Sequence, residues 1–219
     1  MLRIVVICSI LALAGCAGST SKPQQTPASS ESYDLSKLSE LEDDMPPGFI
    51  PYPSEVEKLP AAYVPGVGAV VSQGKPFTAD SGQCQVLLKP VDGQVGAETI
   101  GIRADGQKGR MITVGADMPV AVPAEIPSTG CDRIAYTVPG DRHTSTGTAE
   151  RIAAPTIDGA TTFALTIMMD GFADPEYFYA AILDDRIFVD VHARLAPDFA
   201  AQPLLPDLLV KAVAAIRER

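Results

Sequence analysis

Short runs of alternating apolar and polar residues dominate the second half of the chain. Such alternation places one face of a strand in the core and the other toward solvent. Five runs show it: 98–104, 110–114, 132–138, 162–169 and 186–193. A sixth strand is predicted at 177–183, which is apolar throughout and ends at a turn signal. Asp105-Gly106 joins the first two runs and Asp184-Asp185 joins 177–183 to 186–193, and both dipeptides favour tight turns between antiparallel strands. The pattern therefore predicts an antiparallel sheet.

Helical spacing of apolar residues occurs near both ends of the region that follows residue 33. Leu35, Leu38 and Leu41 predict a short helix, which Pro46-Pro47-Gly48 terminates. A second amphipathic helix, with Pro206 in its first turn, is predicted at the C-terminus. Its apolar stripe consists of Leu205, Leu208, Leu209, Ala212 and Ile216.

One further helix is expected between these two. Asp80-x-x-Gln83 has the form of a capping box, and Pro90 stops the helix that would follow it. Three residues share one face of this helix: Cys84, Leu87 and Leu88. Because strands predominate and their connections are hairpin-like, we predict an α+β fold, an antiparallel sheet with short helices, rather than a doubly wound βαβ fold.

The first residues have the plan of a secretory signal. Arg3 supplies a positive charge, the run 4–13 is apolar, and small residues follow it. This run is too short for a transmembrane helix, which needs about 20 residues. We therefore expect residues 1–15 to be a signal peptide that is removed on export.

Leu13-Ala14-Gly15-Cys16 resembles the lipobox of bacterial lipoproteins. The resemblance implies that Cys16 carries a diacylglyceryl group and anchors the protein to the extracytoplasmic face of the cell membrane, where two chains give stable attachment. The alternative is an ordinary cleaved signal with an incidental cysteine. Residues 16–33 are rich in Ser, Thr and Pro and predict a disordered tether, which leaves 34–219 as a single globular domain.

Composition excludes one large class of partner. Hydrophobic residues make up 46% of the chain and charged residues 20%, values typical of a globular protein, and the formal net charge is −10. A nucleic-acid-binding face needs clustered Lys and Arg side chains, and the sequence has no such cluster. We therefore expect a membrane contact through the lipid anchor and no nucleic-acid partner.

Two cysteines remain after Cys8 leaves with the signal and Cys16 takes the lipid. Exported proteins meet an oxidising environment, so we predict a Cys84–Cys131 disulfide. A loop of this length gives about 4 kcal/mol of stabilisation in the chain-entropy treatment. A redox or metal pair is the alternative, but the sequence has neither CxxC spacing nor a neighbouring His.

Motifs for catalysis and for cofactor binding are absent. The chain has no GxSxG, no HExxH and no phosphate-binding loop, and Val71 stands where a dinucleotide fingerprint beginning at Gly66 needs its third glycine. The carboxylates at 40–44 lack the spacing of a calcium loop, and His143 falls in a loop. We predict no catalytic residues, no metal and no cofactor.

Asp190-Val191-His192 is the one arrangement that suggests acid–base chemistry. On a strand, Asp190 and His192 project from the same face, where a carboxylate can orient an imidazole. We instead interpret this face as the solvent side of a half-exposed strand.

Four aromatic residues mark the place where a ligand pocket is expected: Phe172, Tyr177, Phe178 and Tyr179. They lie around the Asp174-Pro175 turn, and aromatic side chains line many apolar pockets. A small apolar ligand would fit such a pocket. Ordinary packing in the core or at a sheet edge is the alternative explanation.

A series of short segments resembles a family of uncharacterised lipoproteins from mycobacteria and related actinobacteria. The segments are Pro46-Pro47-Gly48-Phe49, the helix from Cys84 to Leu87-Leu88-Lys89-Pro90, Gly130-Cys131-Asp132, and residues 155–162. These proteins are similar in pattern to the extracellular sensor domain of PknH-type receptor kinases. That domain is an α+β unit with a central cleft and two disulfides, whereas this chain has one candidate pair. The resemblance implies a location in the cell envelope and a role in ligand binding or sensing.

The sequence therefore predicts a non-enzymatic, membrane-anchored lipoprotein with a ligand-binding or sensor-like domain. Three alternatives remain open. The domain would be a carrier of a lipid or apolar envelope molecule, a hydrolase with an unrecognised site, or a structural partner of other envelope proteins.

Overall fold

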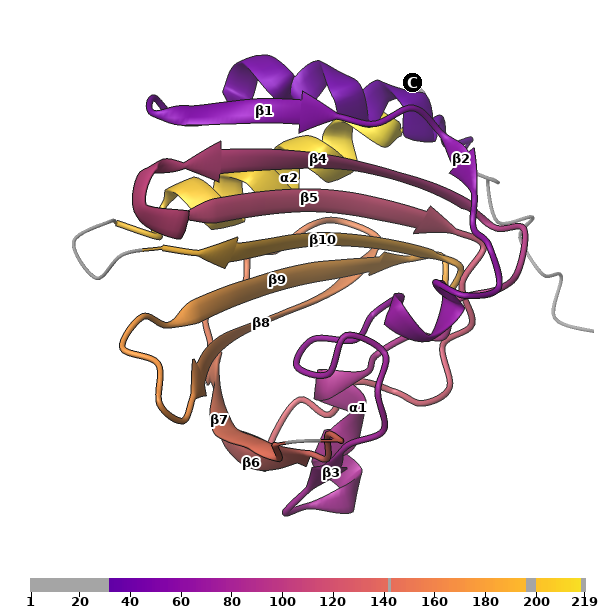
Figure 1. Cartoon of the computed structure of the whole chain (residues 1–219). Coiled ribbons are helices and arrows are strands. Elements are labelled where there is room, and N and C mark those ends of the chain that lie inside the picture. Colours follow the sequence, from indigo (N-terminus) through magenta and orange to yellow (C-terminus); the bar gives the residue numbers. More distant parts are fainter. Residues whose placement is uncertain (1–31, 142, 196–199, 218–219) are drawn as a thin grey trace, which may run out of the picture. The chain divides into compact units, whose positions relative to one another are not determined.

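The structure is a computed structural model that describes residues 32–141, 143–195 and 200–217. Its described residues form one antiparallel sheet of ten strands in the order β1-β4-β5-β10-β9-β8-β7-β6-β3, with β2 also paired to β4 (Figure 1). The strands are β1 (Phe49–Pro53), β2 (Glu57–Lys58), β3 (Thr78–Ala79), β4 (Glu98–Gly106), β5 (Met111–Met118), β6 (Arg133–Val138), β7 (Ser145–Ile152), β8 (Ala160–Met169), β9 (Glu176–Leu183) and β10 (Ile187–Arg194).

Helices are short except at the C-terminus. The α-helices are α1 (Gln85–Leu88) and α2 (Leu204–Ile216), and the 3-10 helices are η1 (Leu35–Asp44), η2 (Val64–Gly66), η3 (Gly82–Cys84) and η4 (Gln107–Gly109). The fold is largely β, which narrows the α+β prediction to a mostly antiparallel sheet with a few short helices and one C-terminal helix.

Each face of the sheet is covered by a separate hydrophobic core. On one face, which we call the helix face, α2 and η1 pack against β4, β5, β10 and β9. On the other, the inner face, α1 lies within the curl formed by β8, β7, β6 and β3 (Figure 1). Alternation along β10 shows the division, since Val189 and Val191 belong to the core of the helix face and Phe188 to the core of the inner face.

The predicted helices at the two ends are confirmed. Leu35, Leu38 and Leu41 are all buried in η1, and the C-terminal stripe is buried in α2. The middle helix is shorter than expected, and its capping box does not form. The backbone N–H of Asp80 donates to Ala135 O and extends the pairing of β3 with β6, so η3 starts only at Gly82.

All six predicted strands are present. Asp184 and Asp185 have φ angles of 49° and 51°, the region that both central residues of a type I′ turn occupy. The β4–β5 hairpin continues past Asp105-Gly106, because Gly106 N–H still donates to Arg110 O and the chain reverses at η4. Sequence patterns missed four strands: β1, β2, β3 and β7.

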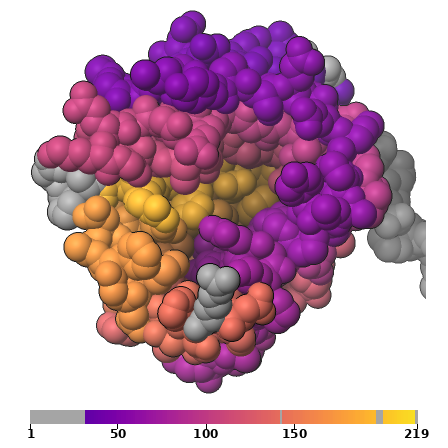
Figure 2. All heavy atoms as spheres, in the orientation of Figure 1, coloured from indigo at the N-terminus to yellow at the C-terminus, as the bar shows by residue number. Residues whose placement is uncertain are grey.

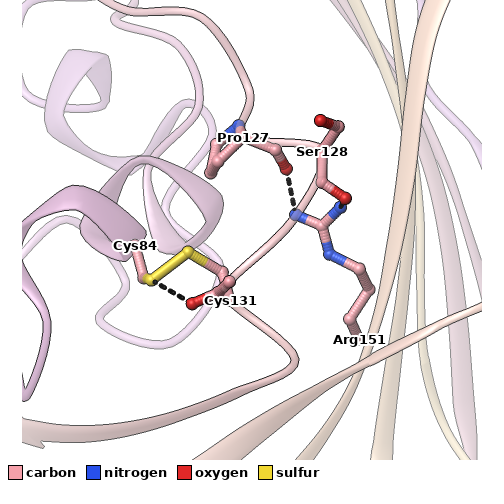
Figure 3. Close-up of a disulfide and its surroundings, with 6 residues drawn as sticks. Cys84, Pro127, Ser128, Cys131 and Arg151 are labelled. Atoms are coloured by element: carbon pink, nitrogen blue, oxygen red, sulfur yellow. Dashed lines mark hydrogen bonds between the residues drawn. A yellow bond between two sulfur atoms is a disulfide. The ribbon is translucent and has the colours of Figure 1, made fainter.

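The Cys84–Cys131 disulfide is confirmed, with the two Cα atoms 5.6 Å apart (Figure 3). It joins the end of η3 to the segment that leads into β6. The guanidinium of Arg151 on β7 donates to the carbonyl oxygens of Pro127 and Ser128 in the same segment. The layer that carries α1 is therefore fastened to the curled part of the sheet.

The predicted signal peptide, Cys16 and the tether up to residue 31 lie outside the described residues. In the part of the chain that the structure describes, no helix has the length and apolar character needed to cross a membrane.

Candidate functional site

The inner face of the sheet is hollowed in its centre (Figure 2). In this view the golden atoms of β10 form the floor of the hollow, and β4 and β5 form its upper rim. Part of the hollow is a trench of about 390 Å³ that runs across the strands. The trench is lined by Tyr52, Ser54, Gly101, Ile102, Arg103, Thr113, Val114, Gly115 and Asp190.

Two glycines create this trench. Gly101 on β4 lies directly opposite Gly115 on β5, and Gly115 in turn lies opposite Asp190 on β10. Side chains on one face of a sheet stand in rows across the strands, so a row with two glycines leaves a strip of bare backbone. The strip runs from the edge of the sheet at Ser54, whose hydroxyl accepts from Gly101 N–H at 2.9 Å, to the carboxyl of Asp190.

Two further rows flank the trench. One consists of Tyr52, Arg103, Thr113 and His192, which are opposite one another on β1, β4, β5 and β10, and its first three members line the trench. The other consists of Thr99, Asp117 and Phe188, of which Asp117 and Phe188 are buried. Beyond Asp190 the row continues into Ala180 and Phe163, which are buried in the core of the inner face. The trench is therefore open at the sheet edge and closed at Asp190.

Asp190 is partly buried, and among the described residues its carboxyl group makes no hydrogen bond or ion pair. Burial and, second, the nearby charge of Asp117 raise the pKa of Asp190 to about 7, although His192 opposes this shift. Asp117 is only 9% exposed, and burial raises its pKa as well, against a hydrogen bond from Thr99 and the charge of Lys89. Two carboxyl groups thus share a poorly solvated position in the middle of the sheet.

His192 has a different partner from the one that the sequence suggested. Asp190 and His192 do project from the same face, but the Nε2 atom of His192 lies 3.0 Å from Oε2 of Glu176 on β9. Arg194 Nε donates to the other carboxylate oxygen of Glu176 at 2.9 Å. The hydrogen bond with His192 is the first cause that lowers the pKa of Glu176 to about 2. This face is therefore a half-covered inner surface and not the solvent side that we expected.

The Tyr136 hydroxyl is a further polar group near this cluster. Tyr136 is only 2% exposed, and its hydroxyl has no hydrogen-bond partner among the residues described. Burial, followed by the charges of Glu176 and Asp170, raises the pKa of Tyr136 to about 12. The ring lies over Gly147 on β7, where a Cβ atom would come within 2.6 Å of the hydroxyl oxygen.

The four aromatic residues predicted to line a pocket do not meet in one place. Phe178 is buried on the inner face, whereas Tyr179 is buried on the helix face, with Tyr177 packed beside that core. Neighbouring residues of a strand point to opposite faces, so a run of aromatic residues on β9 is divided between two cores. Phe172 is 59% exposed in the β8–β9 loop, beside a small hollow of about 100 Å³.

A larger open hollow of about 550 Å³ lies beside η2 and α1. Lys89 lines it, but its amino group already donates to Val67 O and to Val91 O, the latter at 2.8 Å, and lies 3.4 Å from Asp92. His143 is exposed in the loop between β6 and β7. Within the described residues no group of three or more His, Cys, Asp or Glu side chains is arranged to hold a metal ion.

Comparison with known families gives a match over residues 34–217 to the family described as Domain of unknown function (DUF5642). The chain belongs to the DUF5642 family.

One solved structure shares the fold of this DUF5642 chain. It is the X-ray structure of an uncharacterized protein from Mycobacterium smegmatis, an ortholog of Rv0999, with a TM-score of 0.64 and 21% sequence identity. The alignment covers 85% of this chain and 98% of the other. Comparison with curated protein sequences found no match.

Proposed function

We propose that this chain is a membrane-anchored lipoprotein of the cell envelope whose folded domain binds a small ligand in the trench. The observation that carries the proposal is the row Gly101–Gly115–Asp190. Two strand positions without side chains open a path to a carboxyl group that has no partner among the described residues. An uncompensated buried carboxyl group destabilises a fold, so its presence at the end of an open groove is typical of a functional site.

The sensor-like part of the proposal comes from the sequence. The resemblance to the sensor domain of PknH-type kinases implies a ligand-binding or sensing role, and the trench is the site that we propose for that role in this chain. Export and anchoring rest on the lipobox-like Leu13-Ala14-Gly15-Cys16. The anchor is tested by the mass of the mature protein from membranes, which should begin at Cys16 and carry a lipid, whereas Cys16→Ala should release an unlipidated chain.

Ligand binding is tested by screening small molecules against the domain with ligand-detected NMR. Gly101→Val places a side chain on the floor of the trench, and its backbone permits the change because a Cβ atom at Gly101 meets Val114 O only at 3.5 Å. The matched control is Gly82→Ala, where a Cβ atom meets nothing within 4 Å. We expect molecules that bind the wild type and G82A but not G101V. Binding that G101V leaves unchanged would exclude the trench as the site.

A second candidate function is hydrolysis, with Asp190 as a general acid. A carboxyl group with a pKa of about 7 beside a second carboxyl group is suited to donate a proton at neutral pH. A hydrolase reading requires that Asp190→Ala abolish turnover of esters or glycosides, whereas a binding domain turns over neither. The His192–Glu176 pair takes part in such a hydrolytic reaction only if His192→Ala also abolishes turnover.

A further inference from the structure

Around the closed end of the trench, the acidic side chains are not matched by cationic partners. Asp190 and Asp117 lie on neighbouring strands and on the same face. Each carboxylate, when ionised, carries a negative charge that a nearby cation would balance. The cations nearby are already engaged. Arg103 donates to Asp105 at 2.8 Å, and Lys89 donates to two carbonyl oxygens.

Two further cationic or titratable side chains on this face are also paired with a carboxylate. Arg194 donates to Glu176, and His192 is bonded to the same carboxylate. The charge of His192 lowers the pKa of Asp190, and that of Lys89 lowers the pKa of Asp117, but in both groups burial is the larger cause and acts in the opposite direction. No described side chain therefore forms an ion pair with Asp190.

The shape of the trench restricts what can supply the missing cation. Strands in a sheet are about 4.8 Å apart, so the path from β1 to Asp190 on β10 crosses three intervals, roughly 14 Å in all. Its floor is bare backbone at Gly101 and Gly115. At the open end, Tyr52 is 55% exposed, and its ring offers an aromatic face to a chain or a cation. A slender chain with one charged end fits this path.

We infer that the trench binds a ligand with a cationic nitrogen at the end of a narrow chain, and that this nitrogen forms an ion pair with Asp190. The inference rests on the proposed function and names the chemical class of its ligand. A primary ammonium group donates up to three hydrogen bonds, and Asp190, which lines the trench, presents a carboxylate acceptor. The chain lies over the two glycines, with its other end at Tyr52.

Proton release accompanies such binding. A cation beside Asp190 favours the ionised carboxyl group, so binding weakens as the pH falls below the pKa of this group. The other titratable and charged groups around it are Asp117 on β5, Arg103 on β4, His192 on β10, Glu176 on β9 and Lys89 after α1.

The test is an NMR titration of the soluble domain with hexylamine, hexan-1-ol and hexanoate at about pH 8 and about pH 5. We expect hexylamine to bind at least about tenfold more tightly than hexan-1-ol at the higher pH, the size of one charge-assisted hydrogen bond, and to lose this advantage at the lower pH. Hexanoate should not bind. Asp190→Asn keeps the shape of the side chain and should abolish the preference for the amine.

Asp43→Asn is the control, because this carboxylate is exposed near the end of η1, which packs on the helix face and not on the face that carries the trench. It should leave the affinity for hexylamine unchanged. Equal binding of hexylamine to the wild type and D190N, or no binding to either, would overturn the inference. If hexan-1-ol or hexanoate binds the wild type as tightly as hexylamine does at about pH 8, and G101V abolishes that binding, the cationic ligand is overturned and the trench is retained as the site. If G101V affects no ligand in any screen, the proposed function itself fails.

Discussion

Gly115 on β5 lies directly opposite Asp190 on β10, and a Cβ atom added to Gly115 would lie 3.0 Å from the Oδ1 atom of Asp190. This distance is shorter than an ordinary van der Waals contact. Because Gly115 has no side chain, the Asp190 carboxyl group can occupy its position at the end of the trench.

Gly115→Ala should displace the Asp190 carboxyl and leave the sheet intact. The φ angle at Gly115 is one that alanine adopts, and alanine in a strand interior changes stability by only about 1 kcal/mol relative to glycine. We expect the ¹³C carboxyl resonance of Asp190 to titrate at a different pH in G115A. Gly101→Ala, whose Cβ would meet Val114 O at 3.5 Å and not Asp190, should leave that midpoint unchanged. The relationship is refuted if both variants behave alike.

Asp190→Asn should stabilise the domain at alkaline pH. The pKa of Asp190 is about 7 in the folded chain and near 3.8 when unfolded, so the folded state binds more protons between these values, and stability is lost as the pH rises through them. One pKa unit corresponds to about 1.4 kcal/mol, and since Asp190 is only partly buried we expect D190N to raise the free energy of unfolding by about 2 kcal/mol at pH 8.

Urea denaturation across pH measures this effect. The difference between D190N and the wild type should be near zero at about pH 4, should grow toward about pH 7 and should then remain constant. Asp43→Asn, at an exposed position near the end of η1, is the matched control. A D190N variant that is less stable than the wild type at every pH would show that Asp190 holds the fold together.

Glu176→Gln should have the opposite pH dependence. Its folded pKa of about 2 lies below the unfolded value near 4.5, so its contribution is present above about pH 4.5 and is lost as the pH falls toward 2. We expect E176Q to lower the free energy of unfolding by about 2 kcal/mol at neutral pH, because His192 and Arg194 lose their shared acceptor.

Glu150→Gln provides the comparison for E176Q. Glu150 also pairs with an arginine, Arg133 at 2.8 Å, but both side chains are more than half exposed, and such pairs contribute less than about 1 kcal/mol. The prediction fails if the two variants lose equal stability at neutral pH, or if the deficit of E176Q persists at about pH 2.

Removal of the disulfide should be the most destabilising of these changes. Cys84 and Cys131 are 47 residues apart, and closing a loop of that length restricts the unfolded chain by about 4 kcal/mol. We expect the Cys84→Ala/Cys131→Ala double variant to lose about this much by urea denaturation, and reduction of the wild type to cause a similar loss. Little change after reduction would mean that the loop is restricted by other contacts, such as those of Arg151.

The elements that the sequence predicted are those with strong local signals. Alternation over seven or more residues identified β8 and β10, and an apolar stripe identified α2. The missed strands have weak signals. β1 contains Pro51 and Pro53, and proline is tolerated in a strand mainly at a sheet edge, where its missing N–H needs no partner. β7 includes Gly147, which is needed to admit the Tyr136 ring and interrupts the alternation.

The site depends on strand register, which single strands do not reveal. Asp190 and His192 were correctly placed on one face, but Glu176 was missed because its contact with His192 depends on how β9 and β10 align. The turn at Asp184-Asp185 fixes that alignment and is the signal from which Glu176 could have been found. The opposition of Gly101 and Gly115 depends on the β4–β5 alignment, where the turn lies two residues beyond the predicted dipeptide.

The location of the ligand is measured most directly by mapping amide chemical-shift changes on the isotope-labelled domain as hexylamine is added. If the trench is the site, the largest changes occur at Gly101, Gly115 and Asp190 and at their strand neighbours, and D190N loses them. Changes centred instead on the hollow beside η2 and α1, around Lys75 and Lys89, would contradict the account.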